Sequence, residues 1–153
     1  MALISQLKLL INLAFIDGEV GDRERQYILN IGKANGENEE NLSPLFDQPH
    51  DMIVPDNLSD DQKFDFIFSL VQLMKIDEKL YREEIKYCSA VASKLGYDQD
   101  IMFDLMINVK RVKMKDNEIA ELKELTKKYL SWVWFFKSTF LNNLQTVVRQ
   151  GFL

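Results

Sequence analysis

Apolar residues recur every three or four positions along much of this chain, which is the spacing of an amphipathic α-helix. The pattern predicts two helices before residue 37 and two more between residues 66 and 96, each pair joined by a short polar turn. The apolar positions of the first pair are Leu3, Leu7, Leu10, Ile11 and Ala14, then Tyr27, Ile28, Ile31 and Ala34; those of the second are Phe66, Leu70, Leu73 and Met74, then Tyr87, Cys88, Val91 and Leu95. We expect each pair to end at a glycine, Gly36 or Gly96, because glycine tolerates the left-handed conformation that follows a helix C-cap.

The rest of the chain predicts a linker and shorter helices. Residues 37–61 hold all three prolines, eight acidic residues and no Lys or Arg, so we expect an acidic linker with a short helix at Glu39–Phe46. Further helices are predicted at Tyr97–Val109, led by Asp98; at Asp116–Tyr129, with Ile119, Leu122 and Leu125 inside; and at Trp132–Val148, which is rich in aromatic residues. The expected fold class is therefore all-α, an irregular bundle of about seven helices in one domain, residues 1–153.

The two predicted hairpins are copies of one another at a constant offset of 60 residues (77 − 17). The copies span about residues 9–36 and 69–96, the acidic linker 37–61 lies between them, and the C-terminal helices occupy residues 97–150. Leu10, Leu13, Ile16, Asp17, Glu24, Tyr27 and Gly36 recur as Leu70, Leu73, Ile76, Asp77, Glu84, Tyr87 and Gly96. Two copies indicate duplication inside a single core, since open solenoids need three or more repeats.

Each copy places an Asp at the end of its first helix and a Glu seven residues later, at the start of its second: Asp17 with Glu24, and Asp77 with Glu84. If the hairpins pack about a pseudo-two-fold axis, the four carboxylates converge, and their oxygens suit a divalent cation of the Ca²⁺ or Mg²⁺ class. The alternative is structural. Each Asp then binds loop amides, and each Glu serves the N-terminus of its helix, as does Asp22, a predicted N-cap. Arg23, Arg25, Lys79 and Arg82 would neutralise these carboxylates as ordinary surface pairs.

The string Asp17-Gly18-Glu19-Val20 followed by Glu24, with the second Asp77…Glu84 copy, resembles the tellurite-resistance protein TerB family. The same all-helical domain is similar to the N-terminal domain of membrane-tethered DnaJ-like co-chaperones. The resemblance covers most of residues 3–129 and implies a TerB-like fold, no enzyme activity, and a metal site at Asp17, Glu24, Asp77 and Glu84, in the context of stress response or tellurite resistance. The second copy departs from the pattern, because Glu78 stands where the motif prefers Gly.

Composition narrows the classes of function. The chain is 46% apolar and 28% charged, as in a globular domain, and its formal net charge of −5 argues against nucleic-acid binding. No run approaches the roughly 18 apolar residues of a membrane span, and the N-terminal segment lacks the basic start of a signal peptide, so we expect a cytoplasmic protein.

Candidate chemistry outside the repeat is sparse. Cys88 lies on an apolar stripe and predicts a buried structural thiol, whereas His50 in the linker predicts a solvated surface histidine. Lys110–Lys115 predicts a solvated basic turn. Phosphate-binding glycine loops are absent, and we expect no catalytic residues and no enzyme activity.

The aromatic C-terminal segment is the second candidate site. Trp132, Phe136, Phe140, Leu144 and Val147 share one helical face that caps the core, while Trp134 and Phe135 lie off that face and suit partner binding. Dimerisation, docking of an unknown protein partner and peripheral membrane contact stay open, the last weakened by the few basic residues nearby. Two functions therefore remain: a TerB-like module that binds a divalent cation, or a protein-interaction adaptor of co-chaperone type with structural carboxylates.

Overall fold

The computed structural model describes residues 2–76 and 79–130 of the chain. Its elements are α1 (Ala2–Ala14), α2 (Asp22–Ala34), α3 (Glu39–Leu42), the 3-10 helix η1 (Ser43–Asp47), α4 (Asp60–Ile76), α5 (Arg82–Lys94), α6 (Ile101–Asn108), α7 (Asp116–Thr126) and the 3-10 helix η2 (Lys127–Tyr129). The expected all-α class is confirmed, with no strand in the described ranges. Asp77 and the expected helix Trp132–Val148, including Trp134 and Phe135, lie outside the described residues.

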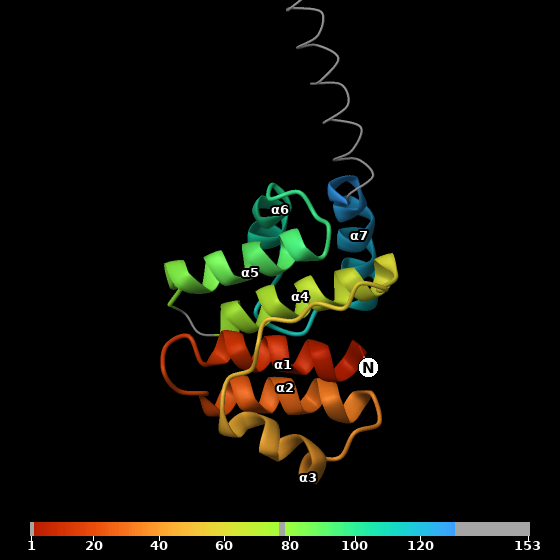
Figure 1. Cartoon of the computed structure of the whole chain (residues 1–153). Helices are drawn as coiled ribbons and strands as arrows, with labels where there is room; N and C mark the ends of the chain where they lie inside the picture. Colours follow the sequence, from red (N-terminus) through yellow and green to blue (C-terminus); the bar gives the residue numbers. More distant parts are fainter. Residues whose placement is uncertain (1, 77–78, 131–153) are drawn as a thin grey trace, which may run out of the picture.

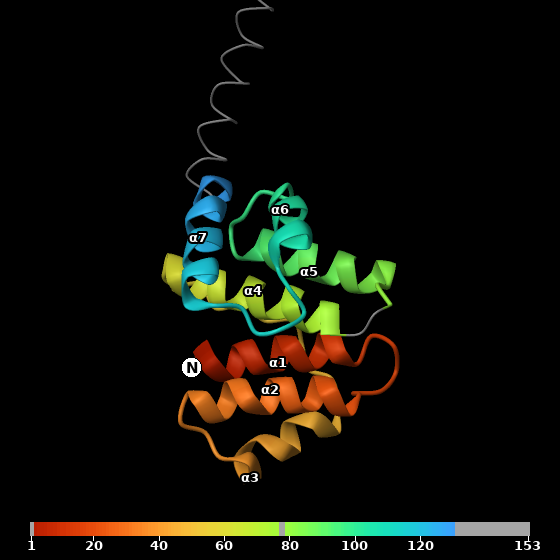
Figure 2. The same ribbon diagram turned by 180° about the vertical axis from the view of Figure 1, so that it is seen from behind.

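The helices of the two hairpins are stacked in the order α2, α1, α4, α5, with α3 beyond α2 and α6 beyond α5 (Figure 1). The view from behind keeps this order and places α7 beside α6 (Figure 2). In both views α1 and α4 start at the same side of the stack, and the chain turns into α2 and α5 at the opposite side. This arrangement is the pseudo-two-fold symmetry that the sequence repeat predicts. No helix of the described part is long and apolar enough to cross a membrane.

The contact between α1 and α4 forms the centre of the core. Ile11 of α1 and Val71 of α4, which the repeat aligns, are both fully buried. Ile28 of α2 and Cys88 of α5 are a second aligned pair. Both are buried, and they pack against this centre from its two opposite sides. Apolar residues at aligned positions of the two copies therefore pack into the same core, each from its own side of the pseudo-symmetry axis.

Two residues predicted to face the core are exposed, Ala34 and Leu125. The buried residues of α2 are Ile28, Leu29 and Gly32. The buried face of α2 therefore differs from the predicted one, because α1 covers one side of this helix and α3 covers another. A Cβ built on Gly32 would come within 2.3 Å of Leu42 in α3, so this glycine permits the close approach of the two helices. Leu125 is exposed because it borders a groove between α6 and α7.

The local signals at the hairpin ends work largely as predicted. Gly36 and Gly96 terminate α2 and α5 with φ of 92° and 95°, the left-handed region that glycine tolerates. The N-cap prediction at Asp22 is wrong by one residue, because Gly21 is extended and caps α2, while Asp22 is the first helical residue. Asp22 and Glu24 still lie in the first turn, where the helix dipole favours negative charge.

Hydrogen bonds across the two hairpins repeat at the same offset of 60 residues as the sequence. The Tyr27 hydroxyl lies 3.4 Å from the carbonyl oxygen of Ser69, and the Tyr87 hydroxyl donates to the carbonyl of Leu9 at 3.1 Å. Tyr27 aligns with Tyr87 and Leu9 with Ser69 (27 + 60 = 87; 9 + 60 = 69). Each hairpin therefore ties its second helix to the first helix of the other copy, which makes the two copies interdependent.

The repeat extends past the hairpins into the segments that follow them. Asn12 Oδ1 accepts a hydrogen bond from the backbone N–H of His50 at 2.6 Å. The aligned residue Gln72 donates from Nε2 to the carbonyl of Lys110 at 3.0 Å, and 50 + 60 = 110. The chain thus crosses back over its own first helix after each hairpin, and residues 39–47 (α3 and η1) occupy the place in the first unit that residues 99–107 (mostly α6) occupy in the second.

This crossing corrects the expectation for the linker and for His50. The short helix expected at Glu39–Phe46 is confirmed as α3 and η1, but the segment belongs to the first repeat unit and does not merely connect the copies. His50 is half-buried, and its ring Nε2 lies 2.8 Å from the carbonyl oxygen of Leu45. A solvated surface histidine was the wrong expectation, because the crossing segment presses His50 against the end of α1.

Candidate functional site

The carboxylates of the first hairpin occupy different environments. Asp17 is exposed in the turn after α1, one residue before Gly18, whose φ of 104° reverses the chain. Glu24 is half-buried in the first turn of α2 and folds back over the N-cap residue Gly21. A Cβ built on Gly21 would lie 3.1 Å from Glu24 Oε1, so the carboxylate sits against the start of its own helix. This placement is the one that the structural alternative predicts for Glu24.

In the second hairpin Glu84 is buried, with only 7% of its surface exposed. It lies in the first turn of α5, one turn before Cys88. Burial raises the pKa of the Cys88 thiol to about 12, and the negative charge of Glu84 adds to the rise. The predicted buried thiol is therefore confirmed. A thiol with so high a pKa is protonated at neutral pH and is a poor nucleophile.

Helices α1 and α4 end, and α2 and α5 begin, on the same side of the helix stack, as convergence of the four carboxylates requires (Figure 1). Among the residues that the structure describes, however, no three His, Cys, Asp or Glu side chains gather closely enough to hold a metal ion. Asp17, Glu24 and Glu84 thus do not form a site by themselves. Asp77 lies outside the described ranges, so the four-carboxylate site stays a prediction.

A different surface stands out where α6 and α7 meet. Phe103 and Ile107 project from α6 with 75% and 76% of their surface exposed, Val112 in the following turn with 60%, and Leu125 of α7 with 41%. These four make up more than half of the seven large apolar side chains that are exposed among the described residues. We call Phe103, Ile107, Val112 and Leu125 the α6–α7 apolar surface. Phe103 and Ile107 are four residues apart on α6, and exposed apolar side chains that share a helix face are typical of a binding site for another protein.

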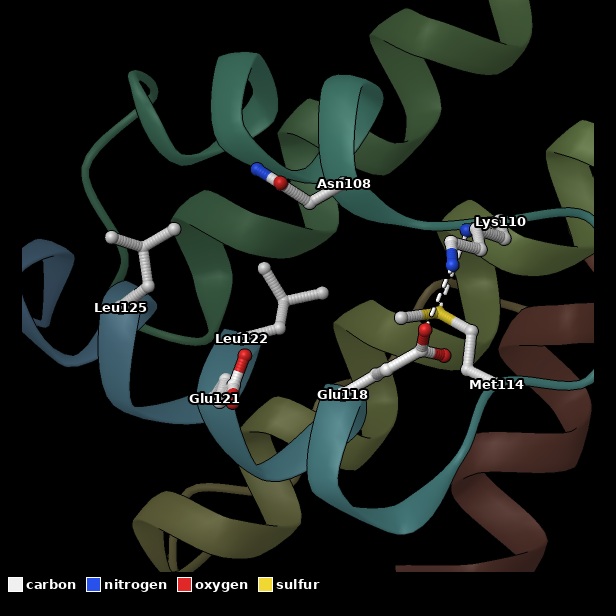
Figure 3. Close-up of a pocket in the computed structure, with 7 residues that line it drawn as sticks. All are labelled: Asn108, Lys110, Met114, Glu118, Glu121, Leu122 and Leu125. Atoms are coloured by element: carbon white, nitrogen blue, oxygen red, sulfur yellow. Dashed lines mark hydrogen bonds and ion pairs between the residues drawn. The ribbon is translucent and has the colours of Figure 1, made fainter.

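A groove of about 370 Å³ lies between α6 and α7 and shares Leu125 with this surface (Figure 3). Leu122 and Leu125 point from α7 toward α6, and Asn108 closes the opposite wall. The polar end of the groove is held by Glu118. It accepts from Lys110 Nζ at 2.8 Å and from the backbone N–H of Lys115 at 3.0 Å. The hydrogen bond from Lys110 is the main reason that the pKa of Glu118 lies below its usual range. Glu118 therefore stays ionised and caps α7, a structural task.

The rest of the basic segment behaves as predicted. Lys110, Arg111, Lys113 and Lys115 are exposed in the turn between α6 and α7, and only Met114 is buried. Among the described residues that line the groove there is no His, Cys or Ser, so the groove offers no nucleophile paired with a base. Its chemistry is that of an apolar contact with a charged rim.

Contacts at both ends hold α6 in place. The Lys75 ammonium donates to the carbonyls of Met106 and Val109, which satisfies acceptors that the helix end leaves open. At the other end, the Tyr129 hydroxyl donates to Asp104 Oδ2 at 2.7 Å, and the N–H of Asp98 donates to the carbonyl of Tyr129. The exposed apolar side chains therefore project from a helix that is fixed at both ends, as a preorganised contact surface requires.

The repeat supplies an internal comparison for this surface. Phe103 aligns with Ser43 and Ile107 aligns with Asp47 (103 − 43 = 60; 107 − 47 = 60), so the corresponding positions of α3 and η1 are polar. The fold of the first unit therefore accepts polar residues at these places, and the high exposure of Phe103 and Ile107 shows that the core of the described residues does not use them. The apolar spacing of the chain does not distinguish these two residues from core positions. The signal that marks them is the repeat itself, once it is extended into residues 39–47 and 99–107.

Searches against protein-family models, curated proteins and solved structures gave no match to this chain. The resemblance to the TerB family therefore rests on the string Asp17-Gly18-Glu19-Val20 with Glu24 and on the second copy, Asp77 with Glu84.

Proposed function

We propose that this chain is a non-enzymatic binding module that engages a protein partner through the α6–α7 apolar surface, with its duplicated carboxylates in structural roles. The observation that carries the proposal is the exposure of Phe103 and Ile107 on a fixed helix, where the other repeat unit uses Ser43 and Asp47. Fully burying a Phe or Ile side chain is favourable by about 1.5–3 kcal/mol, so a partner that covers both would gain substantially.

The other observations agree with a binding role. The described groove lacks a catalytic constellation, and the TerB resemblance implies binding without catalysis. The proposal includes a cytoplasmic location, which the single cysteine supports, since small secreted domains are commonly stapled by disulfides. The aromatic residues Trp134 and Phe135 remain further candidates for the same contact.

The test is a photo-crosslinking residue at position 107, with the same residue at position 47 as the matched control. Both positions are exposed and hold equivalent places in the two units. We expect a protein adduct from position 107, with the partner identified by mass spectrometry of the cross-linked peptide, and none from position 47. Adduct yields that are equal at the two positions would refute the proposal.

A divalent-cation module is the second candidate function. Helices α2 and α5 begin on one side of the stack, and Glu24 and Glu84 hold the same place in their first turns. With Asp17 and Asp77, these residues would supply oxygen ligands from two unlinked parts of the chain, as Ca²⁺ or Mg²⁺ prefers. Thermal stabilisation by the cation is the measurement that tests it.

A further inference from the structure

The exposed face of α6 carries its charges and apolar residues in a definite order. Asp100 precedes the helix, Phe103 and Ile107 follow on the same face, and Arg111 stands just beyond the helix end. All four are exposed; Phe103 and Ile107 are four residues apart on one face of the helix, and Arg111 lies past the helix end, where the backbone of Val109 is extended. The face is therefore acidic at one end, apolar in the middle and basic at the other.

Two of the neighbouring charges are already paired within the chain, because Asp104 lies 3.7 Å from Lys128 and Lys110 lies 2.8 Å from Glu118. The exposed Lys113 and Lys115 add positive charge near Arg111. A face of this kind is complementary to itself when a second copy lies antiparallel, because the acidic end of each copy then meets the basic end of the other. An isologous two-fold contact has this property, since every residue pair occurs twice.

Resting on the proposed function, we propose that the partner of the α6–α7 apolar surface is a second copy of this chain, paired antiparallel through α6. Phe103 of one copy packs on Ile107 of the other, and Asp100 faces Arg111 at both ends. The formal net charge of −5 opposes association in general. The bipolar order along α6 brings opposite charges together at the one place where the copies touch.

The position of α6 allows this contact. It lies at the outer end of the stack, beyond α5, so no other part of the described hairpins lies over its outer face (Figure 1). The area offered by one short helix and its neighbouring groove is small compared with the roughly 1,200–2,000 Å² of a standard interface. We therefore expect a weak dimer in rapid exchange whose population depends on protein concentration and on salt.

Sedimentation equilibrium of the full chain over a range of concentrations tests the pairing. We expect a reversible monomer–dimer equilibrium, with the dissociation constant raised tenfold or more in F103S/I107D. That variant uses the residues that the first unit carries at 43 and 47 and replaces only exposed side chains, so we expect it to fold and its melting temperature to stay close to that of the parent chain.

Charge-reversal variants distinguish the antiparallel two-fold contact from non-specific association. D100K alone and R111D alone should each weaken the dimer several-fold, because both ends of the contact then oppose like charges. An equimolar mixture of the two variants should restore association, since in the mixed dimer each end again joins opposite charges. A chain that is monomeric throughout, or a mixture that associates no better than either variant alone, would overturn the inference.

The outcome also separates this inference from the proposed function. A monomeric chain whose position 107 still cross-links to an identified protein of another sequence overturns the second copy as partner and leaves the binding surface standing. Cross-linked adducts between two copies at position 107 that are lost in D100K and regained in the equimolar mixture of D100K and R111D support both the proposed function and the antiparallel dimer.

Discussion

The hydroxyl of Tyr27 donates a hydrogen bond to Oε1 of Gln72 at 2.9 Å, across 45 residues of sequence and between the two repeat units. The side chain of Gln72 is in turn anchored by its amide to the carbonyls of Lys110 and Val112, at 3.0 Å and 3.1 Å. The aligned tyrosine, Tyr87, lies close enough to Asn12 for the amide to hydrogen-bond its hydroxyl. A tyrosine of each unit thus meets a buried amide of the other, and each amide also holds the segment that crosses over it.

Replacing Tyr27 with Phe should destabilise the chain by about 1–2 kcal/mol, because Gln72 Oε1 is buried and loses its donor. Urea denaturation followed by circular dichroism measures the loss. Tyr81→Phe is the control, since Tyr81 is exposed and the substitution should change stability by less than about 0.5 kcal/mol. Equal losses for the two variants would show that the hydroxyl of Tyr27 contributes nothing across the repeat.

Stability should fall in the alkaline range. Burial raises the pKa of Tyr27 and of Tyr87, the latter to about 12, above the ordinary value of 10. A group whose folded-state pKa is raised contributes fully below its unfolded pKa and loses that contribution as pH rises through the folded value. The free energy of unfolding should therefore decline from about pH 10 toward pH 12. Urea denaturation at pH 9, 10 and 11 tests this, and Tyr87→Phe should make the decline shallower. An identical pH profile for the variant would contradict the assignment to Tyr87.

The sequence was sufficient to predict the hairpins because three independent signals agreed there. The apolar spacing, the turn-ending glycines Gly36 and Gly96, and the seven identities at one offset all pointed to the same helices. The third part of each unit carries weaker signals. Four residues of α3 and a 3-10 turn are too short for periodicity, and α6 begins at Ile101 instead of near Asp98. Asp98 Oδ1 accepts from the N–H of Asp100 at 3.0 Å, and the N–H of Asp98 bonds Tyr129, so tertiary contacts delay the helix.

The binding surface was less predictable for a physical reason. Apolar residues on a short helix are expected to face inward, and α6 is apolar on most sides, so its pattern does not reveal which residues are left outside. Phe103 and Ile107 are exposed because α6 packs through Ile101, Met102 and Leu105. Leu125 was expected inside for the same reason and is exposed beside them. Only the arrangement of α6 against α5 and α7 decides which side of the helix remains open.

Gly36→Ala should destabilise the chain by about 1 kcal/mol through the backbone alone. Its φ of 92° is unfavourable for alanine, while a Cβ at this position would meet no atom within 4 Å. Gly36→Asn is the matched variant, since Asn tolerates the left-handed region better and should lose less. Thermal unfolding of the three proteins gives the comparison. If Gly36→Ala and Gly36→Asn lower the melting temperature by the same amount, the left-handed backbone conformation at residue 36 is not the cause of the loss.

The divalent-cation candidate makes a prediction that structural carboxylates do not share. Millimolar Ca²⁺ or Mg²⁺ should raise the melting temperature, because a ligand that binds only the folded state stabilises it by mass action. The double variant Asp17→Asn with Asp77→Asn should abolish that gain, since it removes one charged ligand from each hairpin while keeping the size of the side chain. Glu19→Gln is the control, because Glu19 is exposed in the same turn as Asp17 but is not part of the duplicated pair. Differential scanning calorimetry with and without the cation measures the effect. A melting temperature that no divalent ion changes, in the parent chain or in the variants, would assign Asp17, Glu24, Asp77 and Glu84 to the architecture of the turns.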